Sequence, residues 1–146
     1  MQIPTFIEMS GAIFRRVKYR LDNARIKTLG SNPLLLISAP GPGQAIDVLA
    51  ATLSIRSTVG YTTGGNVAQL FIGVVPSTFF GQFDNGMFTA GTNLVQITSA
   101  IFTGNDDLVN VENQPLFLST DGNADYTGGA DGNVAIVECF YHLFDV

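Results

Sequence analysis

The chain has 146 residues, of which 46% are hydrophobic and only 13% are charged, and it contains 16 glycines and a net charge of −5. A chain of this length suits one domain that buries about 68% of the surface of its extended form, so its core needs no disulfide or metal. The composition excludes a disordered or largely helical protein and is typical of an all-β protein with many turns.

The sequence carries no sign of export or of membrane insertion. Its single cysteine, Cys139, cannot form an intramolecular disulfide, so cysteine usage does not indicate a compartment. No apolar run is long enough to span a membrane, and residues 1–30 lack the hydrophobic region of a signal peptide. We therefore expect a soluble protein that no conventional signal peptide exports.

Charge is distributed unevenly along the chain. Residues 1–30 hold six basic and two acidic residues, a net charge of +4, whereas residues 31–146 hold one basic and ten acidic residues, a net charge of −9. A basic segment on an acidic body indicates contact with nucleic acid or docking on an acidic protein surface. Because the acidic body would repel a nucleic acid, we favour a protein partner, which includes the acidic body of a neighbouring copy.

Residues 1–32 are the least domain-like part of the chain. The segment 17–21 alternates apolar and basic residues, which indicates an extended conformation. Helical spacing is a competing pattern, carried by Ile13, Phe14, Val17 and Leu21. We interpret residues 1–32 as an extended basic N-terminal arm and residues 33–146 as a single β domain; an ordinary edge strand with a solvated basic face is the alternative. The predicted contact residues of the arm are Arg15, Arg16, Lys18, Tyr19, Arg20, Arg25 and Lys27.

Apolar runs bounded by turn residues predict the strands of the β domain. The run 33–38 ends in an Ala-Pro-Gly-Pro-Gly turn, which is no phosphate loop because Gln44 and Ala45 follow where Lys and Ser or Thr would stand. The run 45–57 has both helical and strand spacing, and one β-bulge near Val48 or Leu49 would make it a single long strand. Further strands are predicted at 67–75, 93–102, 108–111 and 115–119.

Four phenylalanines surround the sequence Asp-Asn-Gly at 84–86, and they are Phe79, Phe80, Phe83 and Phe88. An Asn-Gly pair between apolar residues predicts a hairpin with a type I′ turn. Phenylalanines this close to one turn cannot all reach one core. We predict that some of them form a subunit interface, and simple filling of the core is the alternative.

The last strand, 133–144, is apolar at both odd and even positions. A strand of this kind is buried on both faces, so the rest of the domain or a neighbouring subunit must cover each side. The stretches 61–68 and 126–135 share Tyr-Thr and Gly-Asn-Val-Ala, which suggests two hairpin-like halves of one β domain or a chance match in a glycine-rich chain. About eight strands at this spacing predict an all-β, jelly-roll-like sandwich or barrel.

Catalytic chemistry has little support. Cys139 and His142 are the only plausible thiol and base, and three residues apart on one strand they point to opposite faces. The loop 121–132 begins like a calcium loop, but Tyr126 and Gly132 stand where an EF-hand needs Gly and Glu, and Asx turns explain its acidic residues more simply. We predict a protein that is not an enzyme, with no catalytic residues, no cofactor and no metal site.

Two stretches of turns and strands carry a resemblance to known proteins. Ala-Pro-Gly-Pro-Gly at 39–43 precedes an apolar strand and Gly-Tyr-Thr-x-Gly-Gly at 60–65. Glu-Asn-Gln-Pro-Leu-Phe-Leu-Ser at 112–119 precedes Gly-Asn-x-x-Tyr-Thr-Gly-Gly at 122–129 and the long final strand. This pattern resembles small structural proteins of tailed-bacteriophage virions, above all capsid decoration or cement proteins, and it does not extend into residues 1–32.

The resemblance implies a jelly-roll-type β fold, a homotrimer on the outer capsid surface of the virion and the major capsid protein as partner, without nucleic acid or membrane. The implied function is to bind the assembled shell and stabilise it by mass action. The role of the N-terminal arm as a clamp on neighbouring capsid subunits rests on charge and pattern alone. The alternative function is a receptor- or glycan-binding module of a phage tail fibre or baseplate.

Overall fold

The computed structural model describes residues 5–9, 12–73, 79–99 and 111–146. Its strands are β1 (Thr5–Met9), β2 (Ala12–Asp22), β3 (Leu34–Ile37), β4 (Gln44–Arg56), β5 (Tyr61–Thr62), β6 (Ala68–Ile72), β7 (Phe79–Gln82), β8 (Leu94–Ser99), β9 (Leu116–Thr120), β10 (Thr127–Gly128) and β11 (Val134–Asp145). Its helices are the single turns α1 (Asn23–Lys27) and α2 (Gly86–Thr89). No helix within these ranges is long and apolar enough to cross a membrane.

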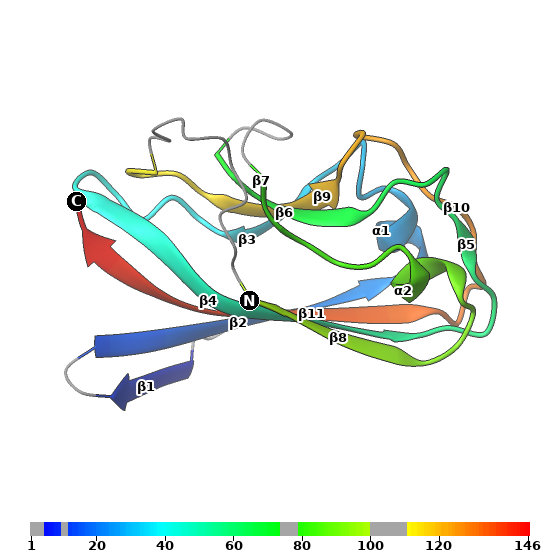
Figure 1. Cartoon of the computed structure of the whole chain (residues 1–146), viewed down its shortest axis with the longest axis horizontal. Coiled ribbons are helices and arrows are strands. Elements are labelled where there is room, and N and C mark those ends of the chain that lie inside the picture. The colour runs from blue at the N-terminus through cyan, green and yellow to red at the C-terminus, as the bar shows by residue number, and fades with distance from the viewer. Residues whose placement is uncertain (1–4, 10–11, 74–78, 100–110) are drawn as a thin grey trace.

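The strands form two stacked antiparallel sheets (Figure 1). One sheet has five strands in the order β1-β2-β11-β4-β8, and the other has four in the order β3-β9-β6-β7. A short ribbon of β10 and β5 closes one end of the stack, next to α1 and α2 (Figure 1). The predicted all-β sandwich is confirmed, while the jelly-roll connectivity stays a prediction.

The hydrophobic core lies between the two sheets. On β11 the residues Ala135, Val137 and Cys139 are at most 1% exposed, because successive side chains of a strand alternate between faces and these three point inward. The four-stranded sheet contributes buried leucines such as Leu70 and Leu118 to the same cluster. One parity of β11 therefore fills the core.

The bulge predicted in β4 is confirmed. Ala50 pairs with Phe140 and Val48 pairs with Tyr141, so Leu49 is the extra residue that has no partner on β11. The extra residue shifts the alternation by one position, which places Val48 on the core side and leaves Leu49 40% exposed. Without the bulge, Ile46 and Val48 at the start of β4 would point away from the core.

The repeated Tyr-Thr stretches meet in the ribbon. Tyr61 of β5 pairs with Gly128 of β10, and Thr62 pairs with Thr127. The rings of Tyr61 and Tyr126 are buried with their centroids 6.4 Å apart. The two related stretches are therefore pairing partners that seal one end of the sandwich, rather than two separate hairpins.

Most of the segment interpreted as an N-terminal arm belongs to the sandwich. β2 pairs with β11 from Asp22, opposite Val134, to Arg15, opposite Tyr141. Leu21 is 1% exposed in the core, and α1 behind it buries Ile26 completely. An extended arm would leave these apolar side chains in water, so the core extends across the expected boundary at residue 32. The alternative interpretation is correct in that this segment is a strand, but β2 lies between β1 and β11 and not at the edge of the sheet.

The type I′ hairpin predicted at 84–86 is absent. Asn85 has φ −58° and is the N-cap of α2, whereas a type I′ turn needs positive φ at both central residues. The carboxylate of Asp84 accepts a hydrogen bond from the backbone of Gly86 (2.7 Å) and supports the helical turn. This turn buries Met87 and Phe88, which a tight hairpin would not do. The strand predicted at 108–111 lies mostly outside the described residues.

We expect trypsin to spare Lys18 and Arg20 in the native protein. A protease needs a locally unfolded segment, and opening β2 would break its pairing with β11 and expose Leu21. Limited digestion followed by mass spectrometry tests this, with digestion in urea as the control in which both sites are cleaved. Rapid cleavage at either residue in the native protein would restore the interpretation of this segment as a free arm.

Candidate functional site

The five-stranded sheet has one face that no other described element covers (Figure 1). We call this the outer face, since it turns away from the core. Cross-strand pairing places side chains of four strands on it. They are Arg16, Lys18 and Arg20 of β2, Val134, Ile136, Glu138 and Phe140 of β11, Ala50, Thr52, Ser54 and Arg56 of β4, and Val95 and Ile97 of β8.

Much of the outer face is apolar. Val95 and Ile97 of β8 are 68% and 71% exposed, and Val134 and Ile136 of β11, on the other side of β4, are half-buried. Exposed apolar side chains gathered on one sheet face are typical of an interaction surface, because their contact with water is unfavourable. The apolar side chains of β11 thus lie on both sides of the sheet, one set in the core and the other on this open face.

The β2 side of the outer face is basic. Arg16 and Lys18 both form ion pairs with Glu138, the latter at 3.8 Å between Nζ and Oε2. The hydrogen bond to Glu138 raises the pKa of Arg16, although exposed ion pairs of this kind add little to stability. The guanidinium carbon of Arg16 also lies 5.9 Å from the centre of the Phe140 ring. The basic side chains of β2 therefore pack against Glu138 and Phe140 of β11.

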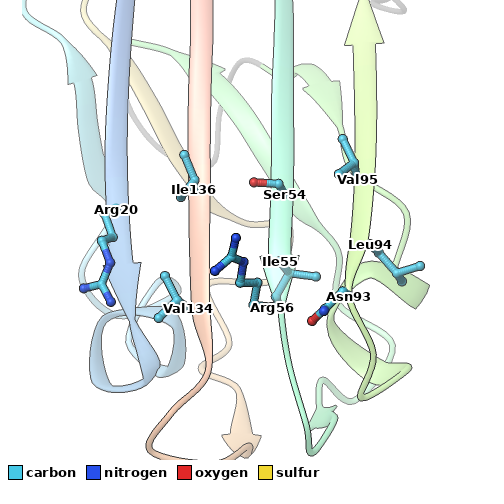
Figure 2. Close-up of a pocket in the computed structure, with 9 residues that line it drawn as sticks. All are labelled: Arg20, Ser54, Ile55, Arg56, Asn93, Leu94, Val95, Val134 and Ile136. Carbon is cyan, nitrogen blue, oxygen red and sulfur yellow. The ribbon is translucent and has the colours of Figure 1, made fainter.

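A hollow of about 480 Å³ lies on the outer face between Arg20 and Arg56 (Figure 2). Val134 and Ile136 of β11 stand between the two arginines, which come from the strands on either side. Residues at its other side come from the end of β4 and the start of β8. They are Ser54, Ile55, Asn93, Leu94 and Val95.

The residues predicted for the capsid-contact arm do not share one surface. Arg16, Lys18 and Arg20 lie on the outer face, where the alternation of β2 places them together. Tyr19 points the other way, and its hydroxyl donates a hydrogen bond to the carbonyl oxygen of Leu36 in the opposite sheet (3.0 Å). Tyr19 therefore connects the two layers and does not belong to the outer face.

The other three basic residues of the predicted arm lie elsewhere. Arg15 lines a second, smaller hollow at the opposite end of the sandwich from α1, together with Pro40 and Tyr141. Arg25 belongs to α1 and donates a hydrogen bond to the carbonyl oxygen of Asn32. Lys27 ends α1. These side chains are too dispersed to act as one contact surface with Arg20.

Two of the four phenylalanines predicted at a subunit interface lie in the core instead. Phe83 and Phe88 are 0% and 1% exposed, and the Phe88 ring lies 5.1 Å from that of Tyr126. Core filling is therefore the correct alternative for these two residues. Phe79 and Phe80 form the start of β7, and their side chains fall outside the described residues.

Cys139 and His142 lie on opposite faces of β11. The Cys139 thiol is fully buried, and burial raises its pKa to about 12. His142 is partly exposed on the outer side, with Nδ1 3.3 Å from a carboxylate oxygen of Asp47 and its ring 6.0 Å from the ring of Phe14. The thiol and the imidazole are therefore separated by the sheet and cannot exchange a proton directly.

The acidic residues of the loop 121–132 hold other segments in place. The two carboxylate oxygens of Asp125 accept hydrogen bonds from the backbone and hydroxyl of Ser31, both at 2.7 Å. Asp121 accepts from the backbone of Val67 (3.0 Å), and Asp131 accepts from the side chain of Asn23 (3.4 Å). Within the described ranges, no three His, Cys, Asp or Glu side chains gather as a metal would require.

We expect Asp125→Asn to destabilise the protein at pH 7 and to reduce its sensitivity to acid. The hydrogen bonds from Ser31 lower the pKa of Asp125, so their contribution is present above the unfolded pKa of about 3.9 and is lost as the pH falls through the folded value. Urea unfolding at pH 7 and pH 3 measures both effects. Ser31→Ala, which removes one of the two donors, should give part of the same change, and an unaltered pH dependence in both variants would contradict the assignment.

We expect the Cys139 thiol to react with a disulfide reagent only when β11 opens. A buried thiol with a raised pKa presents almost no thiolate at pH 8. The rate of labelling should therefore rise by orders of magnitude in urea, with the free thiol of cysteine as the reference. Labelling of the native protein at a rate near that of the reference would show that β11 is not held as described.

The fold and the outer face together define an all-β sandwich with one uncovered, apolar and basic sheet face. No protein-family model matches the chain, and no curated protein matches its sequence. A chain of a solved structure described as the cyanophage Pam1 capsid asymmetric unit is similar at 16% identity, over 97% of this chain and 94% of that chain, with a TM-score of 0.48.

A second similar structure is that of a glycoside hydrolase family 43 arabinoxylan arabinofuranohydrolase from Bacillus subtilis in complex with cellotetraose. The identity is 10%, the similarity covers 95% of this chain and 22% of that chain, and the TM-score is 0.34.

Proposed function

We propose that the chain is a structural protein of a tailed-bacteriophage virion, and more narrowly a capsid decoration or cement protein. The outer face of the five-stranded sheet is the observation that supports this best. A face with Val95 and Ile97 more than two-thirds exposed suits a protein whose working state is bound to another protein surface. The class of partner, the major capsid protein, comes from the resemblance of the turn and strand pattern.

A non-enzymatic role agrees with the chemistry of the described residues. The Cys139 thiol is buried and separated from His142 by the sheet, and the loop carboxylates are engaged by Ser31, Val67 and Asn23. Binding without reaction needs only complementary surface. The outer face offers this as a broad sheet surface with basic residues along β2.

The mechanism that we propose is thermodynamic. A protein that binds the assembled shell but not free capsid subunits stabilises the shell by mass action. A homotrimer, which is taken from the resemblance, would add avidity because three faces can engage at once. The clamp assigned to the N-terminal arm would fall to the basic side chains of β2, where Arg16, Lys18 and Arg20 share the outer face.

We expect the double variant Val95→Lys/Ile97→Lys to fold normally and to bind capsids at least about 100-fold more weakly. Each side chain gives about 1.5–3 kcal/mol when it is buried, and both are exposed in the free protein, so their loss affects docking and not folding. Co-sedimentation with particles that lack the protein measures binding, and thermal unfolding measures stability.

Leu35→Lys is the matched control, since Leu35 is a 42% exposed leucine on the four-stranded sheet. It should leave particle binding unchanged. If the double variant binds particles as tightly as the wild type, the outer face is not the docking surface. If the wild type ignores particles but selects saccharides on a glycan array, the receptor- or glycan-binding alternative holds instead.

A further inference from the structure

Two positive charges on the outer face have no counterion among the residues that the structure describes. Arg20 and Arg56 stand on strands that flank β11, and Figure 2 shows the Arg56 side chain extending from β4 toward β11. Neither guanidinium forms a hydrogen bond or ion pair with any other described residue. The basic neighbours Arg16 and Lys18, in contrast, share the carboxylate of Glu138.

The strand pairing places one acidic residue, Asp22, next to the hollow, and its carboxylate caps α1. Asp22 pairs with Val134 on the other side of β11, and its carboxylate accepts a hydrogen bond from the backbone of Arg25 (2.8 Å) as the N-cap of α1. Glu138, two residues after Ile136 on β11, forms ion pairs with Arg16 and Lys18. The hollow between the two arginines is therefore positively charged, although the chain as a whole has a net charge of −5.

The walls of the hollow strengthen a charge interaction within it. Val134 and Ile136 stand between the arginines, and Val95 borders the far side. Apolar surroundings reduce the screening by water once a partner covers them, so an ion pair there is stronger than one on an open surface. A guanidinium presents a planar fork of donors that matches a carboxylate in a bidentate arrangement.

We propose that this hollow binds a carboxylate side chain of an extended acidic segment on the partner protein, with apolar residues of that segment on Val95 and Ile97. Charge complementarity identifies the occupant. The guanidinium groups of Arg20 and Arg56, which have no described counterion, flank the apolar side chains of Val134 and Ile136. A carboxylate next to aliphatic residues matches both the charge and the apolar surface. The capsid protein as the source of the segment rests on the proposed function. The acidic carboxylate as the bound group rests on the geometry of Arg20 and Arg56.

The probe is a fluorescein-labelled octapeptide of alternating glutamate and valine, compared with the same peptide carrying glutamine for glutamate. Anisotropy should show that the full-length protein binds the glutamate peptide at least tenfold more tightly at low salt than the glutamine peptide. Arg20→Ala/Arg56→Ala should lose this preference, and high salt should weaken it. Arg20→Gln/Arg56→Gln, which keeps more of the side-chain volume, should lose the preference in the same way. Both arginines are exposed, so the variants should fold, and thermal unfolding checks this.

Arg25→Ala/Lys27→Ala removes the same charge from α1, away from the outer face, and should change peptide affinity less than twofold. Equal binding of the two peptides, or unchanged binding by both arginine variants, would overturn the inference. If sedimentation shows a dimer of the wild type that the Arg20/Arg56 variants lose, the occupant is a second copy and the assigned partner is wrong.

Co-sedimentation with particles separates the inference from the proposed function. Wild-type binding to particles that Arg20→Ala/Arg56→Ala weakens at least tenfold would support both. Arginine-dependent binding of the peptide without any binding to particles would leave the inference standing and end the proposed function. Binding to particles that neither arginine variant affects would do the reverse.

Discussion

The pairing of β11 with β2 on one side and β4 on the other is the constraint on which the rest of the structure depends. The ladder with β2 runs from Val134 to Tyr141 and the ladder with β4 from Val134 to Asp145, so a shift of this strand would break both sets of pairs. A slip by one residue would carry Ala135, Val137 and Cys139 out of the core and move the outer parity in. The register of β11 therefore decides which side chains every neighbouring strand presents to each face.

The same register separates stability from recognition. The inner parity of β11 packs against the four-stranded sheet and stabilises the fold, while the outer parity contributes apolar and acidic groups to an open surface. Glu138 illustrates the division, since it forms ion pairs with Arg16 and Lys18, whereas Arg20 has no counterion in the described part of the chain. One strand thus supplies both the core and the charge pattern of the proposed docking face.

The sequence predicted what local patterns and turns determine, and it failed where tertiary pairing decides. The bulge at Leu49 followed from two conflicting parities in one apolar run. The helical turn α2 did not, because burial of Phe88 overrides the Asn-Gly hairpin signal. The arm interpretation failed because an alternating basic segment reads alike on a surface and in a sheet, and only the partner strand distinguishes them.

The alternation of apolar and polar residues in β8 is a sequence feature that could have predicted the outer face. In β8 the apolar residues Val95 and Ile97 share one parity and Gln96 the other, and Gln96 accepts a hydrogen bond from the backbone of Asp84 (2.6 Å) on the inner side of the sheet. The pattern is therefore inverted relative to an ordinary half-buried strand, in which the polar parity faces water. Folding does not require Val95 and Ile97 to lie in water, so a partner surface explains their exposure better than the stability of the chain does. The guanidinium groups of Arg20 and Arg56, which have no counterion among the described residues, add positive charge to the same face.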